Sequence, residues 1–212
     1  TFPRTAAALG CIMTNAPRFI HLRLHSEYSL LQGAVRVKGL PKLCRDAEMP
    51  AVAITDSNNM FAALEASEVL AGAGIQPIIG CQVDLEYLGA ERPGDLAPPP
   101  APLVLLAQNQ VGYENLMKLD SALFLEAGEG LPRVTLKQLG KHADGIICLG
   151  GGADGPAGRL LAAGQRPKAE HLMKTLAGMF GDRLYVELQR HPGADGQYMP
   201  AEQASERGLV EI

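Results

Sequence analysis

The chain has 212 residues, of which 47% are hydrophobic, and 19 basic against 23 acidic residues give it a formal net charge of −4. This length is enough for one full hydrophobic core, so we expect one domain or most of one. The acidic balance excludes a broad positive field for nucleic acid, and no apolar run approaches the roughly 18 residues of a membrane-spanning helix.

The first twelve residues contribute nothing to the fold that we predict. Their apolar stretch is too short for a secretory signal, and the cleavage pattern is poor. We therefore expect 1–12 to be a leader or a disordered segment, and the domain to occupy 13–212.

From Phe19 onward, short apolar runs alternate with stretches of helical period. In 19–25 the apolar residues share one face, as a strand of period two requires, and 51–55 is wholly apolar, as in a strand covered on both faces. Strands are predicted at 19–25, 51–55, 75–83, 103–107, 145–149 and 184–188, and helices at 37–48, 60–71, 111–126 and 168–180. This alternation predicts an α/β fold with a parallel sheet and right-handed crossovers.

Two segments have a different composition. Residues 88–102 hold five of the fifteen prolines, which predicts an exposed insertion loop. Residues 201–212 have helical character, but no capping signal or further strand follows them, so we interpret the chain as truncated from a longer one.

The cysteines indicate the cellular compartment. Cys11, Cys44, Cys81 and Cys148 lie far apart and form no CxxC pair. This spacing is typical of reduced thiols rather than of disulfides or zinc ligands, and we expect a cytoplasmic protein.

Functional side chains in parallel βα units lie at the carboxyl ends of strands, which here selects His25, Asp56 and Gln82. Arg23 stands between His21 and His25 on one strand face, where its permanent charge would repel a divalent ion. Asp56 has two interpretations, a general base or ligand and a cap of the following helix, and we favour the cap.

The glycine-rich run LGGGADGPAG at 149–158 also has two interpretations. It lies between a predicted strand and a helix, where phosphate-binding loops occur. Because it has neither GxGxxG nor a GK[ST] ending, we favour a flexible turn.

Four motifs carry a family resemblance. They are HLRLHSEYSLLQGA (21–34), MPAVAITDSNNM (49–60), GIQPIIGCQV (74–83) and GYENLMKLDSALFLE (112–126). In order and spacing they resemble the polymerase-and-histidinol-phosphatase (PHP) domain at the N-terminus of bacterial replicative DNA polymerase III alpha subunits. The resemblance implies a distorted, TIM-like (βα)7 barrel, of which this chain supplies about six strands and lacks the last.

In metal-binding PHP domains, His, Asp, Glu and Cys side chains hold the ions that hydrolyse phosphoesters. The resemblance places the ligand positions within this chain on Arg23, His25, Gln32, Ser57, Gln82, Pro102 and Gly152, where only His25 has the expected residue type. The substituted residues cannot replace lost carboxylates and imidazoles, so we expect no catalytic residue and no metal in this segment.

We therefore interpret these positions as a vestigial metal pocket, together with His21 and Asp56. Arg23 is expected to fill the emptied space with a fixed positive charge and to pair with Asp56 or Glu27.

The resemblance also implies a function. The parent chain would be a DNA-directed DNA polymerase, a nucleotidyltransferase, whose Mg²⁺ ions and DNA contacts lie in other domains. This segment would be a non-catalytic scaffold that packs on the palm and thumb domains and docks the proofreading 3'-5' exonuclease subunit among other holoenzyme subunits, with no membrane contact. Two alternatives stay open: a metal-dependent phosphoesterase or nuclease of the PHP family, and the PHP domain of an error-prone polymerase paralogue.

Overall fold

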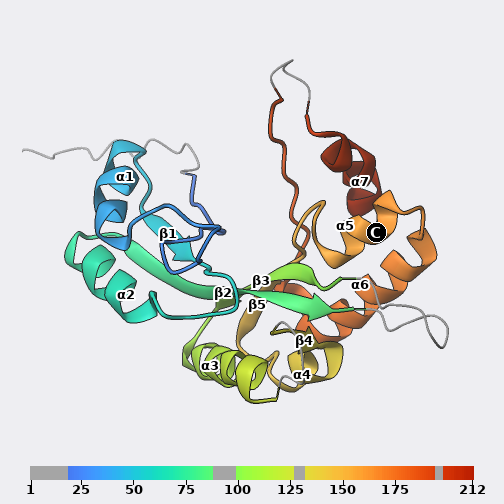
Figure 1. Ribbon diagram of the computed structural model, residues 1–212, viewed down its shortest axis with the longest axis horizontal. Coiled ribbons are helices and arrows are strands. Elements are labelled where there is room, and N and C mark those ends of the chain that lie inside the picture. The colour runs from blue at the N-terminus through green and yellow to red at the C-terminus, as the bar shows by residue number, and fades with distance from the viewer. Residues whose placement is uncertain (1–18, 88–98, 127–131, 194–197) are drawn as a thin grey trace, which may run out of the picture.

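The computed structural model describes residues 19–87, 99–126, 132–193 and 198–212. Within them a six-stranded sheet has the order β1-β2-β3-β5-β6, and β4 pairs with β2 (Figure 1). The strands are β1 (Ala51–Ile54), β2 (Gln76–Glu86), β3 (Ala101–Ala107), β4 (Val134–Thr135), β5 (Ile146–Leu149) and β6 (Leu184–Tyr185). The helices are α1 (Leu40–Asp46), α2 (Ala63–Gly72), α3 (Gln110–Leu125), α4 (Leu136–Lys141), α5 (Pro156–Ala162), α6 (Arg166–Phe180) and α7 (Pro200–Glu211), with short 3-10 turns at Val37–Gly39 and Gly181–Arg183.

The sheet is mixed and open, and the prediction of a wholly parallel sheet is wrong. β1 runs parallel to β2, and β5 runs parallel to β6, but β3 is antiparallel to both of its neighbours, β2 and β5. The cause of the error is physical: an apolar run shows that a strand is covered on both faces, and carries no information on its direction.

The predicted strand at 19–25 is in the expected place but is not a regular strand. It runs beside β1, where Ala53 N donates to His21 O at 2.8 Å and Thr55 N to Leu24 O at 2.9 Å. Between these two bonds the segment advances by three residues and its neighbour by two, and Leu24 N donates to the hydroxyl of Thr55. An isolated bridge between His21 and Val52 therefore replaces a continuous strand.

Other boundaries also differ from the prediction. β3 begins at Ala101, so the last two residues of the predicted loop 88–102 belong to a strand, whereas 88–98 lie outside the described residues. The predicted strand 184–188 is regular for two residues only, and β4, α4 and α5 are not among the predicted elements. The predictions for 1–12 and for Cys11 also fall outside the described residues.

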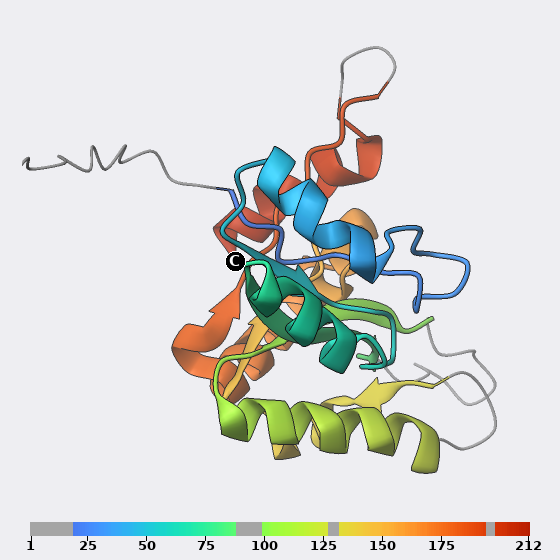
Figure 2. The ribbon, with the colours of Figure 1, turned by 90° about the vertical axis from the view of Figure 1, so that its left-hand side faces the viewer.

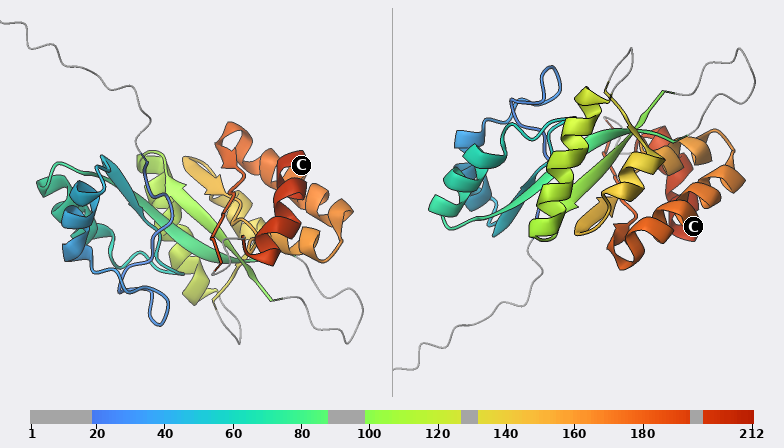
Figure 3. Two further views of the ribbon diagram at one scale, coloured as in Figure 1. Left: turned by 90° about the horizontal axis from the view of Figure 1, so that it is seen from above. Right: turned by 90° about the horizontal axis from the view of Figure 1, so that it is seen from below.

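The main core lies between the sheet and the helices on its underside, where α3 crosses the strands (Figure 3). Leu116, Leu119 and Leu123 of α3 pack with Leu103 and Leu105 of β3, and all five are almost fully buried. Their spacing along α3 follows the helical period that the sequence predicted.

A second core joins α1 and α2 to the outer face of β1, and a third, smaller cluster lies on the opposite face of the sheet. In the second, Leu40 and Leu70 pack with Val52. The third contains Val104 and Leu106, and it forms part of the floor of the site described below. No helix in the described part of the chain is long and apolar enough to span a bilayer.

Candidate functional site

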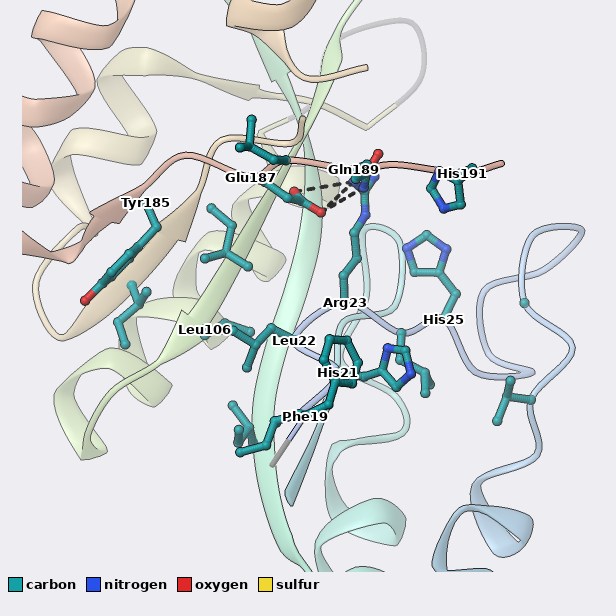
Figure 4. Close-up of a pocket in the computed structure, with 18 of the residues that line it drawn as sticks. Phe19, His21, Leu22, Arg23, His25, Leu106, Tyr185, Glu187, Gln189 and His191 are labelled. Carbon is teal, nitrogen blue, oxygen red and sulfur yellow. Dashed lines mark hydrogen bonds and ion pairs between the residues drawn. The ribbon is translucent and has the colours of Figure 1, made fainter. Parts of the chain in front are cut away.

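A groove of about 1070 Å³ opens on the sheet face that carries Val104 and Leu106 (Figure 4). One wall is the segment 19–25 and the other is 185–191, the segment that begins with the last residue of β6. The floor is apolar and includes Ile78 and Leu106, whereas Arg23 and His25 line a polar part. The groove therefore brings the first described segment and the segment after β6 to one site.

Arg23 is the central cation of this polar part. Its Nε and Nη2 donate to the same oxygen, Oε1 of Gln82, at 3.1 and 2.8 Å. Its Nη1 donates to Glu187 at 3.3 Å, and Gln189 donates to the same carboxylate at 2.8 Å (Figure 4). The side chains of Arg23 and Glu187 are 21% and 15% exposed, so the pair is shielded from much of the solvent.

Gln82 connects Arg23 to three further positions of the predicted pocket. The chain after β1 stays beside β2, because Gln82 N donates to Asp56 O and Asn58 N donates to Gln82 O. Ser57 is thereby held next to Gln82, whose Nε2 donates to the Ser57 hydroxyl at 3.3 Å. That hydroxyl donates in turn to Gln32 Oε1 at 2.5 Å.

His25 binds the same network from its other side. Its Nε2 lies 3.2 Å from Gln82 Oε1, and since that oxygen is an acceptor, His25 carries its proton on Nε2. Burial, followed by the charge of Arg23, lowers the pKa of His25, so the imidazole is neutral at pH 7.

Asp56 is buried and forms a separate cluster. Its carboxylate accepts from Ser26 N and Ser26 Oγ at 2.7 Å each, and from Ser29 Oγ at 2.6 Å. The prediction that Asp56 caps the following helix is wrong, since α2 begins after Ala62 without a side-chain cap. Asp56 instead holds the turn that follows the first segment.

The predicted ion pair of Arg23 with Asp56 or Glu27 is also wrong. Glu187 is the partner of Arg23, and Glu27 accepts from Val37 N. Sequence reasoning missed Glu187 and Gln189 because the rule on strand ends was applied to the first three predicted strands alone. Applied to the predicted strand 184–188, the same rule selects this segment.

The remaining predicted positions lie around this network. The ring of His21 contacts Phe19 edge to face with centroids 4.7 Å apart. Pro102 pairs with Asp84 across β3 and β2, in register two residues from Gln82. Gly152 has φ of +61°, and a Cβ added there would lie 3.2 Å from the side chain of Gln189, so Gly152 lies next to a residue of the second wall.

The glycine-rich run 149–158 holds a close-packed turn between the end of β5 and the start of α5. Gly155 N donates to the carbonyls of Gly151 and Gly152 at 2.9 and 3.2 Å. Gly151 has φ of +78°, and a Cβ there would collide with Pro102 O at 2.2 Å. The glycines are thus explained by left-handed backbone and close approach, as the turn interpretation expects.

This donor set does not fit a divalent-metal cluster. Arg23 is a permanent cation at its centre, Gln82 Oε1 is engaged by Arg23 and His25, and both Asp56 oxygens accept hydrogen bonds from serines. Among the described residues, no group of three or more His, Cys, Asp and Glu side chains is arranged to hold a metal ion. The geometry supports a structural network instead.

Comparison with known proteins adds the family relationship. The model of the PHP domain family matches residues 21–191. DNA polymerase III subunit alpha of Caulobacter vibrioides is 42% identical over 193 residues, which cover 91% of this chain and 16% of that protein. The subunits of Borreliella burgdorferi and Pseudomonas aeruginosa are 35% and 39% identical over 84% and 81% of this chain. The chain thus spans 14–16% of the length of these relatives.

A solved structure of a putative metal-dependent phosphoesterase from Bifidobacterium adolescentis aligns with a TM-score of 0.49 and 12% identity. The alignment covers 91% of this chain and 82% of that chain.

Proposed function

The chain belongs to the PHP domain family, and from this premise we propose that it is the non-catalytic scaffold domain of a bacterial replicative DNA polymerase III alpha subunit. The parent polypeptide is then a cytoplasmic DNA-directed DNA polymerase. Its Mg²⁺-dependent synthesis and its DNA contacts belong to other domains, and this segment contributes protein contacts to the palm, the thumb and the proofreading exonuclease subunit.

One observation carries the non-catalytic part of the proposal. Arg23 donates to Gln82 and pairs with Glu187, so a guanidinium and its partners fill the polar part of the groove. Four of the expected ligand positions, at Arg23, Gln32, Ser57 and Gln82, hydrogen-bond in one chain with His25. A network whose members satisfy one another stabilises the fold without an ion.

We also propose that the open sheet is part of a distorted (βα)7 barrel, closed by a further strand of the parent polypeptide. The two walls of the groove support this proposal. Leu22 on one wall is 40% exposed and Leu188 on the other is 45% exposed, and the Arg23–Glu187 pair holds the walls together at one point. An extended segment between the walls would bury both leucines.

Calorimetric titration with Mn²⁺ and Zn²⁺, together with hydrolysis assays on single-stranded DNA and p-nitrophenyl phosphate, tests the absence of metal chemistry. The wild-type chain should bind no stoichiometric ion and release no product. A variant that restores the family's ligand types, with Arg23→His, Gln32→Asp, Ser57→His and Gln82→Glu, is the positive control and should bind metal if circular dichroism shows that it folds. Stoichiometric metal and a hydrolytic activity lost in His25→Ala would overturn the proposal.

Hydrogen exchange on the full alpha subunit, alone and with the proofreading exonuclease subunit, tests the docking role. Protection on binding should appear at amides within 19–212. Protection confined to other parts of the alpha subunit would contradict this role.

A further inference from the structure

Two consecutive leucines project from the loop between the first segment and α1. Leu30 is 83% exposed and Leu31 is fully exposed. Leu31 also has φ of +65°, in the left-handed region that residues other than glycine rarely adopt. Figure 2 shows this loop as the blue segment that protrudes at the right of the molecule.

The loop is held rigidly despite its exposure. Ser29 Oγ donates to the buried Asp56 carboxylate at 2.6 Å, and Ser29 O accepts from Gln32 N at 3.0 Å and Gly33 N at 2.8 Å. Gln32 is bound on its side chain by Ser57. Both ends of the Leu30–Leu31 pair are therefore fixed, one by the hydrogen bond of Ser29 to Asp56 and the other by that of Gln32 to Ser57. Backbone strain that is maintained by surrounding contacts is typical of functional sites.

The same loop contacts the start of α2, where more apolar side chains are exposed. Tyr28 Oη donates to Glu65 at 3.0 Å, and Asn59 Nδ2 donates to Tyr28 O at 3.3 Å. Phe61 and Leu64 are 70% and 72% exposed in this second segment. We define the tip patch as Tyr28, Leu30, Leu31, Phe61 and Leu64.

The charges near the tip patch decide what kind of partner it suits. Within 26–34 and 57–68 the sequence has Glu27, Glu65 and Glu68 and no lysine or arginine. Anionic lipid and nucleic acid both require basic residues at their contact surface. A protein surface with an apolar pocket and a basic rim complements the patch in both shape and charge.

We propose that the tip patch is a docking site for a protein partner, with Leu30 and Leu31 entering an apolar pocket whose basic rim faces Glu65 and Glu68. The proposal rests on the scaffold role proposed above and assigns a surface to it. Because the hydrogen bonds of Asp56 and Gln32 hold the leucines in place before binding, the partner gains their contacts without ordering the loop.

The test measures binding of the full alpha subunit to the proofreading exonuclease subunit by surface plasmon resonance. Leu30→Ser combined with Leu31→Asn should weaken affinity at least about tenfold, since few central residues carry most of the energy of an interface. Asn tolerates the left-handed backbone, so the loop keeps its conformation. Glu68→Lys, an exposed charge reversal, should also weaken binding, and more so at low salt.

Leu125→Ser is the matched control, because Leu125 is 84% exposed on α3, outside the tip patch. The affinity of this variant for the exonuclease subunit should stay within about twofold of wild type, a change of less than about 0.5 kcal/mol in binding free energy. Equal binding by wild type and the Leu30/Leu31 variant, with unchanged melting temperature, would overturn the tip patch and leave the docking role standing.

No binding by wild type would reject the docking role and the tip patch together. Binding of wild type, but not of the variant, to phosphatidylserine vesicles would also overturn the assignment to a protein partner.

Discussion

The guanidinium of Arg23 lies 3.3 Å from the carboxylate of Glu187, although 164 residues separate them in the sequence. Arg23 belongs to the segment beside β1, and Glu187 follows β6 at the other edge of the sheet. The pair therefore joins the two walls of the groove, and the same arginine donates to Gln82 of β2. Arg23, one of the predicted ligand positions, thus links the two edges of the sheet.

Replacing either partner of this ion pair leaves the other charge partly buried without a counter-charge. We expect Arg23→Ala and Glu187→Ala each to lower the free energy of unfolding by about 1–3 kcal/mol, with a coupling of about 1 kcal/mol in the double mutant, because the pair is only partly shielded. Urea denaturation of the wild type, the two single mutants and the double mutant measures both the loss of stability and the coupling. The exposed pair of Lys42 and Asp46 on α1 is the control, and its cycle should couple by less than about 0.5 kcal/mol. Equal coupling in both cycles would contradict a special role for Arg23.

Gln82→Glu places a carboxylate against His25 in place of an amide oxygen. The pKa of His25 is lowered by burial and by Arg23, and a neighbouring negative charge acts in the opposite direction. The variant should therefore titrate His25 at a higher pH than wild type, as followed by the NMR shifts of its ring. Gln203→Glu on α7, an exposed position, should leave the titration unchanged. An unchanged His25 pKa in Gln82→Glu would show that the imidazole does not contact residue 82.

Asp120 on α3 is partly buried, and its Oδ1 accepts no hydrogen bond from the residues that the structure describes. Burial raises its pKa from 3.8 to about 6. The folded state then holds the proton more tightly than the unfolded state, so the contribution of this group to stability is fully present below about pH 4 and is lost as the pH rises through 6.

Asp120→Asn should therefore raise the free energy of unfolding at pH 7.5 by about 1 kcal/mol, after allowance for partial solvent access, with no gain near pH 4. Denaturation at both pH values checks this. Asp144→Asn, at an exposed turn, should show no such pH-dependent gain. A gain of equal size at both pH values would mean that the charge of Asp120 is not the cause.

Asp56→Asn removes the carboxylate that accepts three hydrogen bonds from Ser26 and Ser29. One amide oxygen cannot accept all three, and the new NH₂ group faces donors, so we expect a loss of about 2–4 kcal/mol in the free energy of unfolding. Hydrogen exchange should also increase at Gln32 and Gly33, whose amides are held by Ser29 O. Asp84→Asn, where Asn58 donates to the side chain from a partly buried site, should cost less. Unchanged hydrogen exchange at Gln32 and Gly33 would show that Asp56 does not hold the conformation of this loop.

Local patterns in the sequence predicted much of the fold. The apolar spacing of α3 and α6 and the wholly apolar run of β1 gave these elements nearly their observed limits, because periodic burial is written directly in residue order. The four motifs were enough to indicate the PHP family, which the family match confirms over residues 21–191. That Gln32, Ser57 and Gln82 stand in place of metal ligands stays a prediction that rests on the family resemblance.

The partners of polar side chains could not be read in this way. Asp56 was predicted to cap the helix that follows it, yet it binds serines 27 and 30 residues earlier in the chain. A carboxylate that follows a strand can cap the next helix or accept hydrogen bonds from a distant segment. Which of the two it does depends on the segment that the fold places beside it. The antiparallel direction of β3 could not be predicted for the same reason. Pairing between strands depends on neighbours that the strand's own residues do not specify.

The sequence by itself determined which segments are buried and the family to which they belong. The tertiary structure decided that Arg23 pairs with Glu187, that Gln32, Ser57 and Gln82 bind one another, and that Leu31 stands exposed on a strained loop. The reason is that hydrophobic burial follows a short-range pattern along the chain, whereas each of these contacts or constraints joins segments that only the folded sheet brings together.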